Sequence, residues 1–352
     1  MDKREKMFCF DLIRVLSTFL IVCCHFSVAF SQYNISGFSN YLLNFANSDS
    51  GKLGVYLFFM ISGSTLIYNY QGDEFSILQF YKKRWIRIFP LFYLAWILFY
   101  FIKVMEVKNF LFNGSITRFR WTIMGIDYYV GGMYPTYAIV GEWFTGAIIV
   151  IYVIFPLLRL LYKHSLLYYI TSIVLYILYL VNFFIFPLPH TTNVETVFVD
   201  IFYFWVGMVL IKERESLKNI PIYLLIIPLV PLLIVKNQYS ITTNSLIISI
   251  IIYILCMRVY NGEVLESNIV FKFISKYSYA IYLTHHQIIY LVIKNFANGY
   301  LPIWKSFIIY CIIWLIIGSV SAFLTKLNTT LLNIFKYRFF GNSQENNFMK
   351  LG

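Results

Sequence analysis

Apolar segments of about 20 residues recur along the whole chain, and they constrain its fold more than any other feature. A helix needs about 20 mostly apolar residues to cross the hydrocarbon core of a bilayer. Segments of this kind lie near residues 8–31, 52–70, 88–105, 137–161, 166–188, 196–211, 220–235, 241–259, 277–296 and 304–326. Only 12% of the 352 residues are charged, about half the fraction of an average soluble domain. We therefore predict an all-α fold, a polytopic transmembrane helical bundle with about ten spans.

The positive charges predict the orientation of this bundle. With the N-terminus inside, most of the 28 Lys and Arg residues fall on the cytoplasmic side, as the positive-inside rule requires. Both termini are then cytoplasmic. Residues 1–340 form a single integral-membrane domain, and residues 341–352 form a short cytoplasmic tail. The first segment carries Arg14 and His25 and lacks a small-residue cleavage site, so we expect a permanent span rather than a signal peptide.

The formal net charge of +12 would suggest a nucleic-acid partner in a soluble protein. In a membrane protein the same charge is explained by topology, so we expect contact with membrane lipids and no nucleic-acid partner. The abundance of Ile, Lys, Asn, Tyr and Phe is typical of an AT-rich genome, which favours a bacterial plasma membrane. The five cysteines contain no CxxC pair, so they predict neither a disulfide framework nor a zinc site.

Two ionisable side chains share one face of the first segment. Arg14 and His25 are eleven residues apart, which on a helix returns to within about 20° of the same face after a rise of roughly 16 Å. Ionisable residues inside spans are costly and indicate function by default. The structural alternatives are a snorkelling arginine at the interface and a histidine that forms a hydrogen bond between helices.

A cluster of basic residues, Lys82-Lys83-Arg84-Trp85-Ile86-Arg87, precedes Pro90. We expect a cytoplasmic loop here, which topology alone explains. The functional alternative is a phosphate clamp, because the arginine fork matches phosphate oxygens. Glu142 begins a later span and either lies at the interface or orients an imidazole from a neighbouring helix.

The pair His285-His286 lies in the ninth segment, with Tyr282 one turn before it. Adjacent residues face different directions on a helix, so we expect at most one of the two imidazoles to point into the bundle. No third ligand stands at a fixed spacing, and we expect no metal site. Asp200 and Ser62-Gly63 are weaker candidates, since the latter is typical of close helix packing.

The longest external connection runs from about Glu106 to Thr136 and includes Arg118, Trp121 and Asp127. A connection of this length is usually functional or disordered. Its aromatic content favours order, and it is a candidate for sugar stacking.

Five motifs resemble the signatures of the membrane-bound acyltransferase family 3, the integral-membrane O-acyltransferases of bacterial surface polysaccharides. In chain order they are Asp11-Leu-Ile-Arg14 followed by His25, Phe58-Phe59 to Ser62-Gly63, Tyr81 to Pro90 with Arg84 and Arg87, Trp143 to Tyr152 and Pro156, and Ser278-Tyr279-Ala-Ile-Tyr282-Leu-Thr-His285. One position departs from the pattern, because Ile148 stands where many members carry a glutamate.

The resemblance implies transfer of an acyl group, usually acetyl, from cytoplasmic acyl-CoA to a sugar hydroxyl of an exported polysaccharide or its lipid-linked precursor. Acetyl-CoA is then the donor, its phosphates bound by Lys83, Arg84 and Arg87 with Arg14 nearby. His25 is the expected general base, either in direct transfer or through an acyl-His25 intermediate. Glu142, Tyr282 and His285 are expected to orient the imidazole or stabilise the oxyanion.

Two other functions fit the residues. A transporter or flippase for a lipid-linked glycan or small solute also needs buried charges, but it predicts internal repeats and broken helices, and no repeat is visible. The other alternative is a non-catalytic scaffold or sensor that retains the fold. The departure at Ile148 leaves this alternative open.

Overall fold

The computed structural model describes residues 8–37, 49–72, 74–112, 114–130, 134–181, 194–234, 240–258 and 268–340. Within these ranges every regular element is a helix, and the only strand-like pairing is an isolated bridge between Ser36 and Tyr300. The all-α prediction is thus confirmed. The tail predicted at 341–352 lies outside the described residues.

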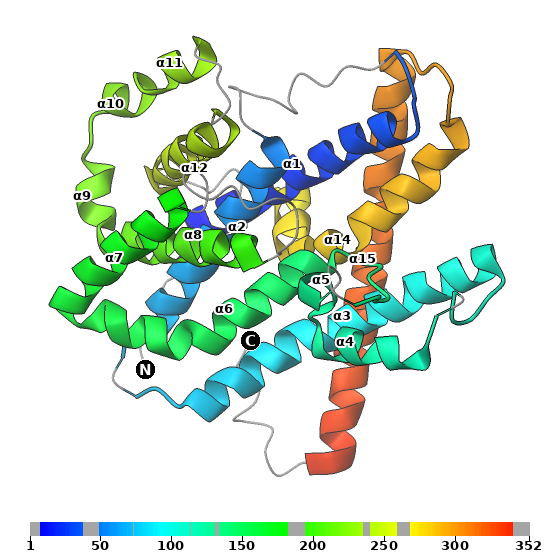
Figure 1. Cartoon of the computed structure of the whole chain (residues 1–352), viewed down its shortest axis with the longest axis horizontal. Coiled ribbons are helices and arrows are strands. Elements are labelled where there is room, and N and C mark those ends of the chain that lie inside the picture. Colours follow the sequence, from blue (N-terminus) through cyan, green and yellow to red (C-terminus); the bar gives the residue numbers. More distant parts are fainter. Residues whose placement is uncertain are drawn as a thin grey trace.

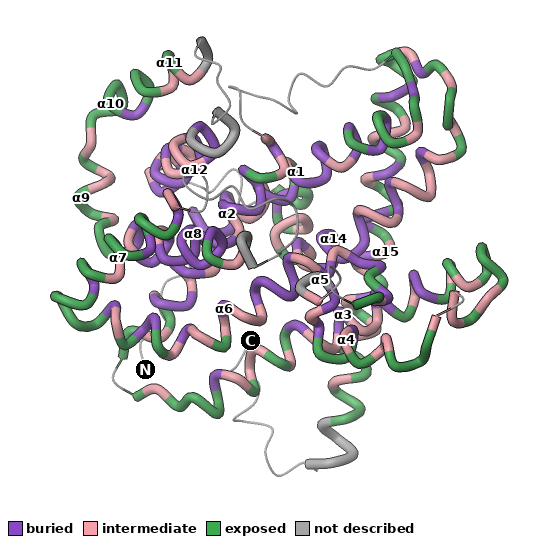
Figure 2. The backbone as a smooth tube through the Cα atoms, viewed as in Figure 1, coloured by how far each residue is buried: buried purple, intermediate pink, exposed green. Residues whose placement is uncertain are grey.

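Four helices form the centre of the bundle (Figure 1). They are α1 (Phe8–Gln32), α2 (Ser50–Asn69), α8 (Val194–Lys212) and α14 (Ile269–Ile293). α1 packs against both α2 and α14, and α2 packs against α8. In Figure 2 the buried residues concentrate on these helices, whereas α7 (Ser165–Leu180), α10 (Ile222–Ile226) and α11 (Leu229–Ile234) are largely exposed at the periphery.

The basic cluster lies inside a helix and not in a loop, which corrects the prediction. α3 (Ile77–Val107) begins before Lys82 and continues through Pro90. Ser76 caps its start by accepting the backbone N–H of Gln79, a role that serine performs well. Proline is tolerated inside membrane helices, and α14 contacts this part of α3 because the Tyr279 hydroxyl donates to the carbonyl of Ile88.

The other predicted segments also correspond to helices, with one break. The remaining long elements are α6 (Glu142–Lys163), α12 (Ser240–Arg258) and α15 (Ile303–Phe340), and the short ones are η2 (Ile116–Arg118), α4 (Phe119–Met124), α5 (Asp127–Val130), α9 (Arg214–Lys218) and η4 (Lys294–Phe296). The seventh segment is divided into α10 and α11 by a turn that contains Pro228. Proline has no backbone N–H to continue a helix.

Five of the described helices are long and apolar enough to cross a membrane: α1, α2, α3, α6 and α15. This finding rests on length and composition. It agrees with the prediction of a multi-pass membrane protein. The count of ten spans and the cytoplasmic placement of both termini stay predictions.

Glycines bring α2 and α8 into close contact. A Cβ atom added at Gly63 would lie 2.0 Å from the carbonyl oxygen of Phe204, and one added at Gly207 would lie 1.9 Å from that of Met60. The Ser64 hydroxyl also donates to the Gly207 carbonyl at 2.7 Å. Small residues and interhelical hydrogen bonds of this kind hold helices together in lipid, where apolar surface supplies no driving force between them.

The connection between α3 and α6 is partly helical, in agreement with the expectation of order. Its short helices bury Asp127, whose carboxylate accepts the Thr122 hydroxyl at 2.9 Å. The second carboxylate oxygen of Asp127 is buried and has no hydrogen-bond partner among the described residues. Burial raises the pKa of Asp127 from an ordinary value of 3.8 to about 6, because the charged form is poorly solvated there.

Gly207→Ala should destabilise the protein by about 1–3 kcal/mol, the usual cost of overpacking. The new methyl group collides with backbone and not with a movable side chain. Thermal unfolding of the detergent-solubilised protein measures the effect. Gly318→Ala is the matched control, since its Cβ would only approach the Phe273 ring at 3.3 Å. Equal unfolding temperatures for the two variants would contradict the packing argument.

Asp127→Asn should flatten the dependence of stability on pH. A carboxyl whose pKa is raised on folding stabilises the fold at low pH, and this contribution disappears as the pH rises from about 4 through about 6. The stability of wild type relative to the variant should therefore fall by up to about 3 kcal/mol between pH 4 and pH 7. Unfolding curves at several pH values test this, and parallel curves for the two proteins would refute it.

Candidate active site

Three imidazoles cluster where α1 meets α14. The ring centroid of His25 lies 4.9 Å from that of His285 and 5.0 Å from that of His286. His285 is fully buried, whereas His25 and His286 are half-buried. The expectation that at most one of the adjacent histidines faces the bundle was wrong. The His25 ring lies close to the His285 and His286 side chains of α14, so it contacts both rings.

Backbone contacts define the protonation of the neutral His285 ring. Its Nδ1 lies 2.6 Å from the carbonyl oxygen of Tyr282 and 3.2 Å from that of Ile281. Carbonyl oxygens only accept, so Nδ1 carries the proton and Nε2 carries a lone pair. This Nε2 and the Nδ1 of His25 are both buried without a hydrogen-bond partner among the described residues. The cluster thus holds nitrogen atoms that are free to exchange a proton.

A cavity of about 1160 Å³ opens beside this cluster, between α1, α2, α3, α6, α14 and α15. Five cationic side chains line it, and Asp11 is its one acidic residue within the described part of the chain. The cationic residues are Arg14, Arg84, Arg87, Lys272 and Lys276. A cavity with this charge imbalance favours an anionic ligand.

Several polar atoms in the cavity wall lack partners. They are the Nε of Arg84, the hydroxyl of Thr65 and the side-chain oxygen of Asn328, all buried without a hydrogen-bond partner in the described structure. Buried polar groups are normally paired, so each exception requires an explanation. The Arg84 guanidinium is held over the rings of Phe80 and Tyr152, 5.8 Å from each centroid. A polar, anionic ligand in the cavity would satisfy these groups.

Arg14 is anchored and does not simply snorkel. Its Nη1 forms an ion pair with Asp11 at 2.6 Å. The same carboxylate oxygen accepts the Ser275 hydroxyl at 2.6 Å. Arg14 is therefore held in the cavity wall at the junction of α1 and α14.

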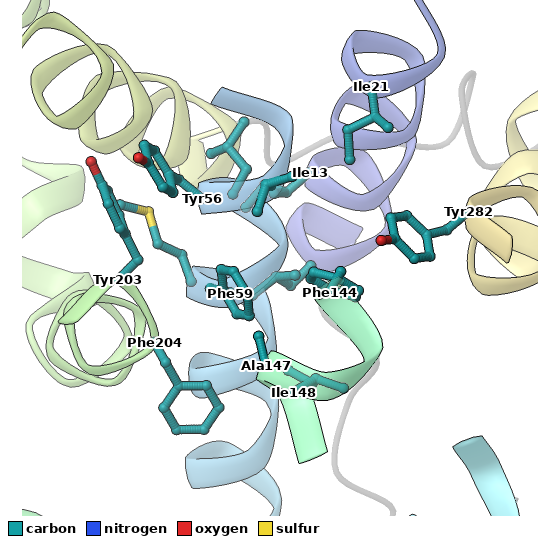
Figure 3. Close-up of a cluster of buried hydrophobic side chains, with 14 of the residues drawn as sticks. Ile13, Ile21, Tyr56, Phe59, Phe144, Ala147, Ile148, Tyr203, Phe204 and Tyr282 are labelled. Carbon is teal, nitrogen blue, oxygen red and sulfur yellow. The ribbon is translucent and has the colours of Figure 1, made fainter. Parts of the chain in front are cut away.

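Tyr282 belongs to both the cavity and the histidine cluster. Its side chain lines the cavity, and its ring centroid lies 5.6 Å from that of His285 and 4.8 Å from that of Phe144. Figure 3 shows Tyr282 extending from α14 toward Phe144, with Ile148 one turn further along α6. The Tyr282 hydroxyl donates to the Gly141 carbonyl at 2.7 Å. Neither His25 nor His285 lines the cavity, so Tyr282 stands between the two parts of the site.

Glu142 is the first residue of α6, and its side chain binds the turn that precedes the helix. Its Oε1 accepts the backbone N–H groups of Ile139 and Val140, the latter at 2.7 Å. Gly141 adopts a positive φ of +46°, where a side chain would also crowd the Tyr282 ring. Gln287 of α14 donates to the Ile139 carbonyl. Glu142 thus orders the turn and Gln287 holds that turn against α14, and no hydrogen bond joins Glu142 to His25 among the described residues.

The cavity wall differs from the predicted cationic set at three lysines. Lys83 is not among the lining residues, whereas Lys272 and Lys276 are. Ile148 lines the cavity, so the wall is apolar at the position where the sequence resemblance implies a glutamate. The spacing of four between the two lysines placed them on one helix face, which was the available signal in the sequence.

A comparison with protein families gives one match, and it covers most of the chain. The model of the acyltransferase domain matches residues 7–326. No curated protein and no solved structure matches the chain. The matched region contains the histidine cluster, four of the five helices of membrane-spanning length, most of α15, and all residues of the cavity wall except Asn328 and Leu332. The chain belongs to acyltransferase family 3.

Proposed function

We propose that this protein transfers an acetyl group from acetyl-CoA to a sugar hydroxyl of an exported polysaccharide or its lipid-linked precursor. The observation that carries the proposal is the basic cavity that adjoins a buried histidine cluster. Coenzyme A is polyanionic and carries its thioester at the end of a long arm. The cationic side chains of the cavity would bind the phosphates, and the histidines would serve the acyl transfer.

The donor is bound through its phosphates. Arg84 and Arg87 are three residues apart on α3 and both line the cavity, so their guanidinium groups are neighbours on one helix face. Arginine binds phosphate oxygens through paired hydrogen bonds. Arg14 is partly neutralised by Asp11 and contributes less. The pantetheine arm then extends past Tyr282 toward His25.

His25 acts as the general base. The sugar oxygen attacks the thioester carbonyl carbon while His25 takes the hydroxyl proton, and the carbon–sulfur bond breaks to release CoA, which receives that proton. Imidazole is the side chain that most often serves as a general base. The lone pair on His285 Nε2 is available to accept a hydrogen bond from the His25 imidazolium. No covalent acyl-enzyme is required.

The acceptor approaches from the opposite side of His25. His286 lies there with Tyr290, whose ring centroid is 4.4 Å away, and Tyr33 is 5.9 Å from Tyr290. Both tyrosines are half-buried. Aromatic faces with a hydroxyl at the edge suit the apolar and polar faces of a sugar ring. These residues are a better stacking surface than the connection between α3 and α6.

This arrangement requires a membrane that separates donor from acceptor. With ten spans and both termini in the cytoplasm, the basic cavity faces the cytoplasmic pool of acetyl-CoA. α1 and α14 run parallel, since Asp11 contacts Ser275 near one end and His25 contacts His285 further along. Parallel helices are what the predicted first and ninth spans require. A bacterial plasma membrane supplies both substrates.

His25→Ala should abolish acetyl transfer, with a loss of at least about 100-fold from removal of the base. The assay follows CoA release from labelled acetyl-CoA by the purified protein with a polysaccharide extract as acceptor. His164→Ala, which changes an exposed histidine between α6 and α7, is the control. Full activity of a folded His25→Ala protein would exclude the base assignment.

Replacing Arg84 and Arg87 with glutamine should raise KM for acetyl-CoA by at least about 100-fold, because a hydrogen bond to a charged group contributes about 1.5–3 kcal/mol and two such bonds are lost. The KM for the acceptor should stay constant. Arg214→Gln, which changes a half-buried arginine that is paired with Glu215 and does not line the cavity, controls for loss of positive charge. An effect confined to the acceptor would refute the phosphate assignment.

A further inference from the structure

Two separate pairs of cations line the cavity, and the proposed function so far uses only one. Arg84 and Arg87 belong to α3, whereas Lys272 and Lys276 are one turn apart on α14. Neither lysine forms an ion pair with a described residue. The acidic residue in the wall, Asp11, is already engaged by Arg14 and Ser275. The lysine pair therefore presents uncompensated charge.

The lysines lie farther along the helix axis from the histidine cluster than the α3 backbone next to Arg87 does. Lys272 and Lys276 precede His285 by 13 and nine residues, which corresponds to about 20 and 14 Å along the helix axis. The carbonyl of Ile88, next to Arg87, accepts the hydroxyl of Tyr279, and Tyr279 precedes His285 by only about 9 Å along the axis. Both lysines and Arg87 are exposed, whereas Arg84 is half-buried and its Nε is buried. The lysine pair thus lies at the mouth of the cavity, and the arginine pair reaches deeper into the wall through Arg84.

We propose that Lys272 and Lys276 bind the 3′-phosphate of coenzyme A and make the site selective for CoA over dephospho-CoA. The inference rests on the proposed function, because it concerns the same donor. Along CoA the 3′-phosphate is remote from the thioester, and the diphosphate lies between them. A donor whose thioester points toward His25 therefore places its diphosphate near the arginines and its 3′-phosphate near the lysines.

The chemistry of the two pairs fits this order. A phosphate monoester carries nearly two negative charges at neutral pH. Two lysine ammonium groups at an exposed mouth match that charge and adapt to its position, since lysine acts as a flexible point charge. The deeper diphosphate is fixed by the planar arginine forks, which orient the arm that follows it. Loss of the 3′-phosphate should therefore weaken binding without disturbing the diphosphate.

The test is isothermal titration calorimetry of the purified full-length protein with CoA and with dephospho-CoA. Wild type should bind CoA at least about tenfold more tightly, the equivalent of about 1.4 kcal/mol. The double variant Lys272→Gln/Lys276→Gln should bind both ligands alike, with a Kd close to that of wild type for dephospho-CoA. Arg84→Gln/Arg87→Gln should weaken both ligands while it preserves their ratio. Lys82→Gln/Lys326→Gln removes the same charge from residues that do not line the cavity and should preserve wild-type affinities.

Each outcome separates this inference from the proposed function. A CoA preference that survives in the Lys272/Lys276 variant overturns the inference, and so does equal affinity of wild type for the two ligands. A preference that disappears only in the Lys272/Lys276 variant supports the inference, even where no acetyl transfer is detected. Absence of transfer with selective CoA binding would refute the proposed function alone. Failure of wild type to bind CoA refutes both.

Discussion

The shared carboxylate of Asp11 is the interaction on which the site depends. It is buried between α1 and α14, where it binds the Arg14 guanidinium and the Ser275 hydroxyl. A buried charge is costly unless it is paired and hydrogen-bonded, so this carboxylate strongly favours one alignment of the two helices. That alignment brings His25 opposite His285 further along the bundle. It also leaves Arg14 in the wall of the cavity with much of its charge compensated.

The cavity is positively charged because few acidic side chains line its described wall. Ile148 lines the cavity at the position where the sequence resemblance implies a glutamate, and Glu142 is engaged with the backbone of the preceding turn. Asp11, which is paired with Arg14, is thus the one acid of the described wall. A second carboxylate would weaken the attraction of the cavity for a polyanion. Under the proposed function, an apolar residue at this position would therefore favour donor binding and would leave proton transfer to the histidines.

The helices could be predicted from the sequence because apolar runs of membrane-spanning length have few alternative structures. The helix boundaries could not be predicted. The basic cluster was expected in a loop because of its charge, yet α3 extends through it. The Arg14–His25 face and the arginines of α3 followed from helical periodicity. The contact of His25 with both His285 and His286 did not, because it depends on where α1 crosses α14. The lysines of α14 were missed for the same reason, since only packing assigns them to the cavity.

Tyr282 connects the two halves of the site. It lines the basic cavity on one side and contacts His285 on the other, and its hydroxyl is bound to the Gly141 carbonyl. Under the proposed function, a thioester that moves from the cavity to His25 would pass this ring, and a movement of the ring away from the cavity would break that hydrogen bond. Gly141 belongs to the turn that Glu142 holds through Ile139 and Val140. Glu142 would therefore act on the proposed reaction through the position of Tyr282, since no hydrogen bond joins it to His25 among the described residues.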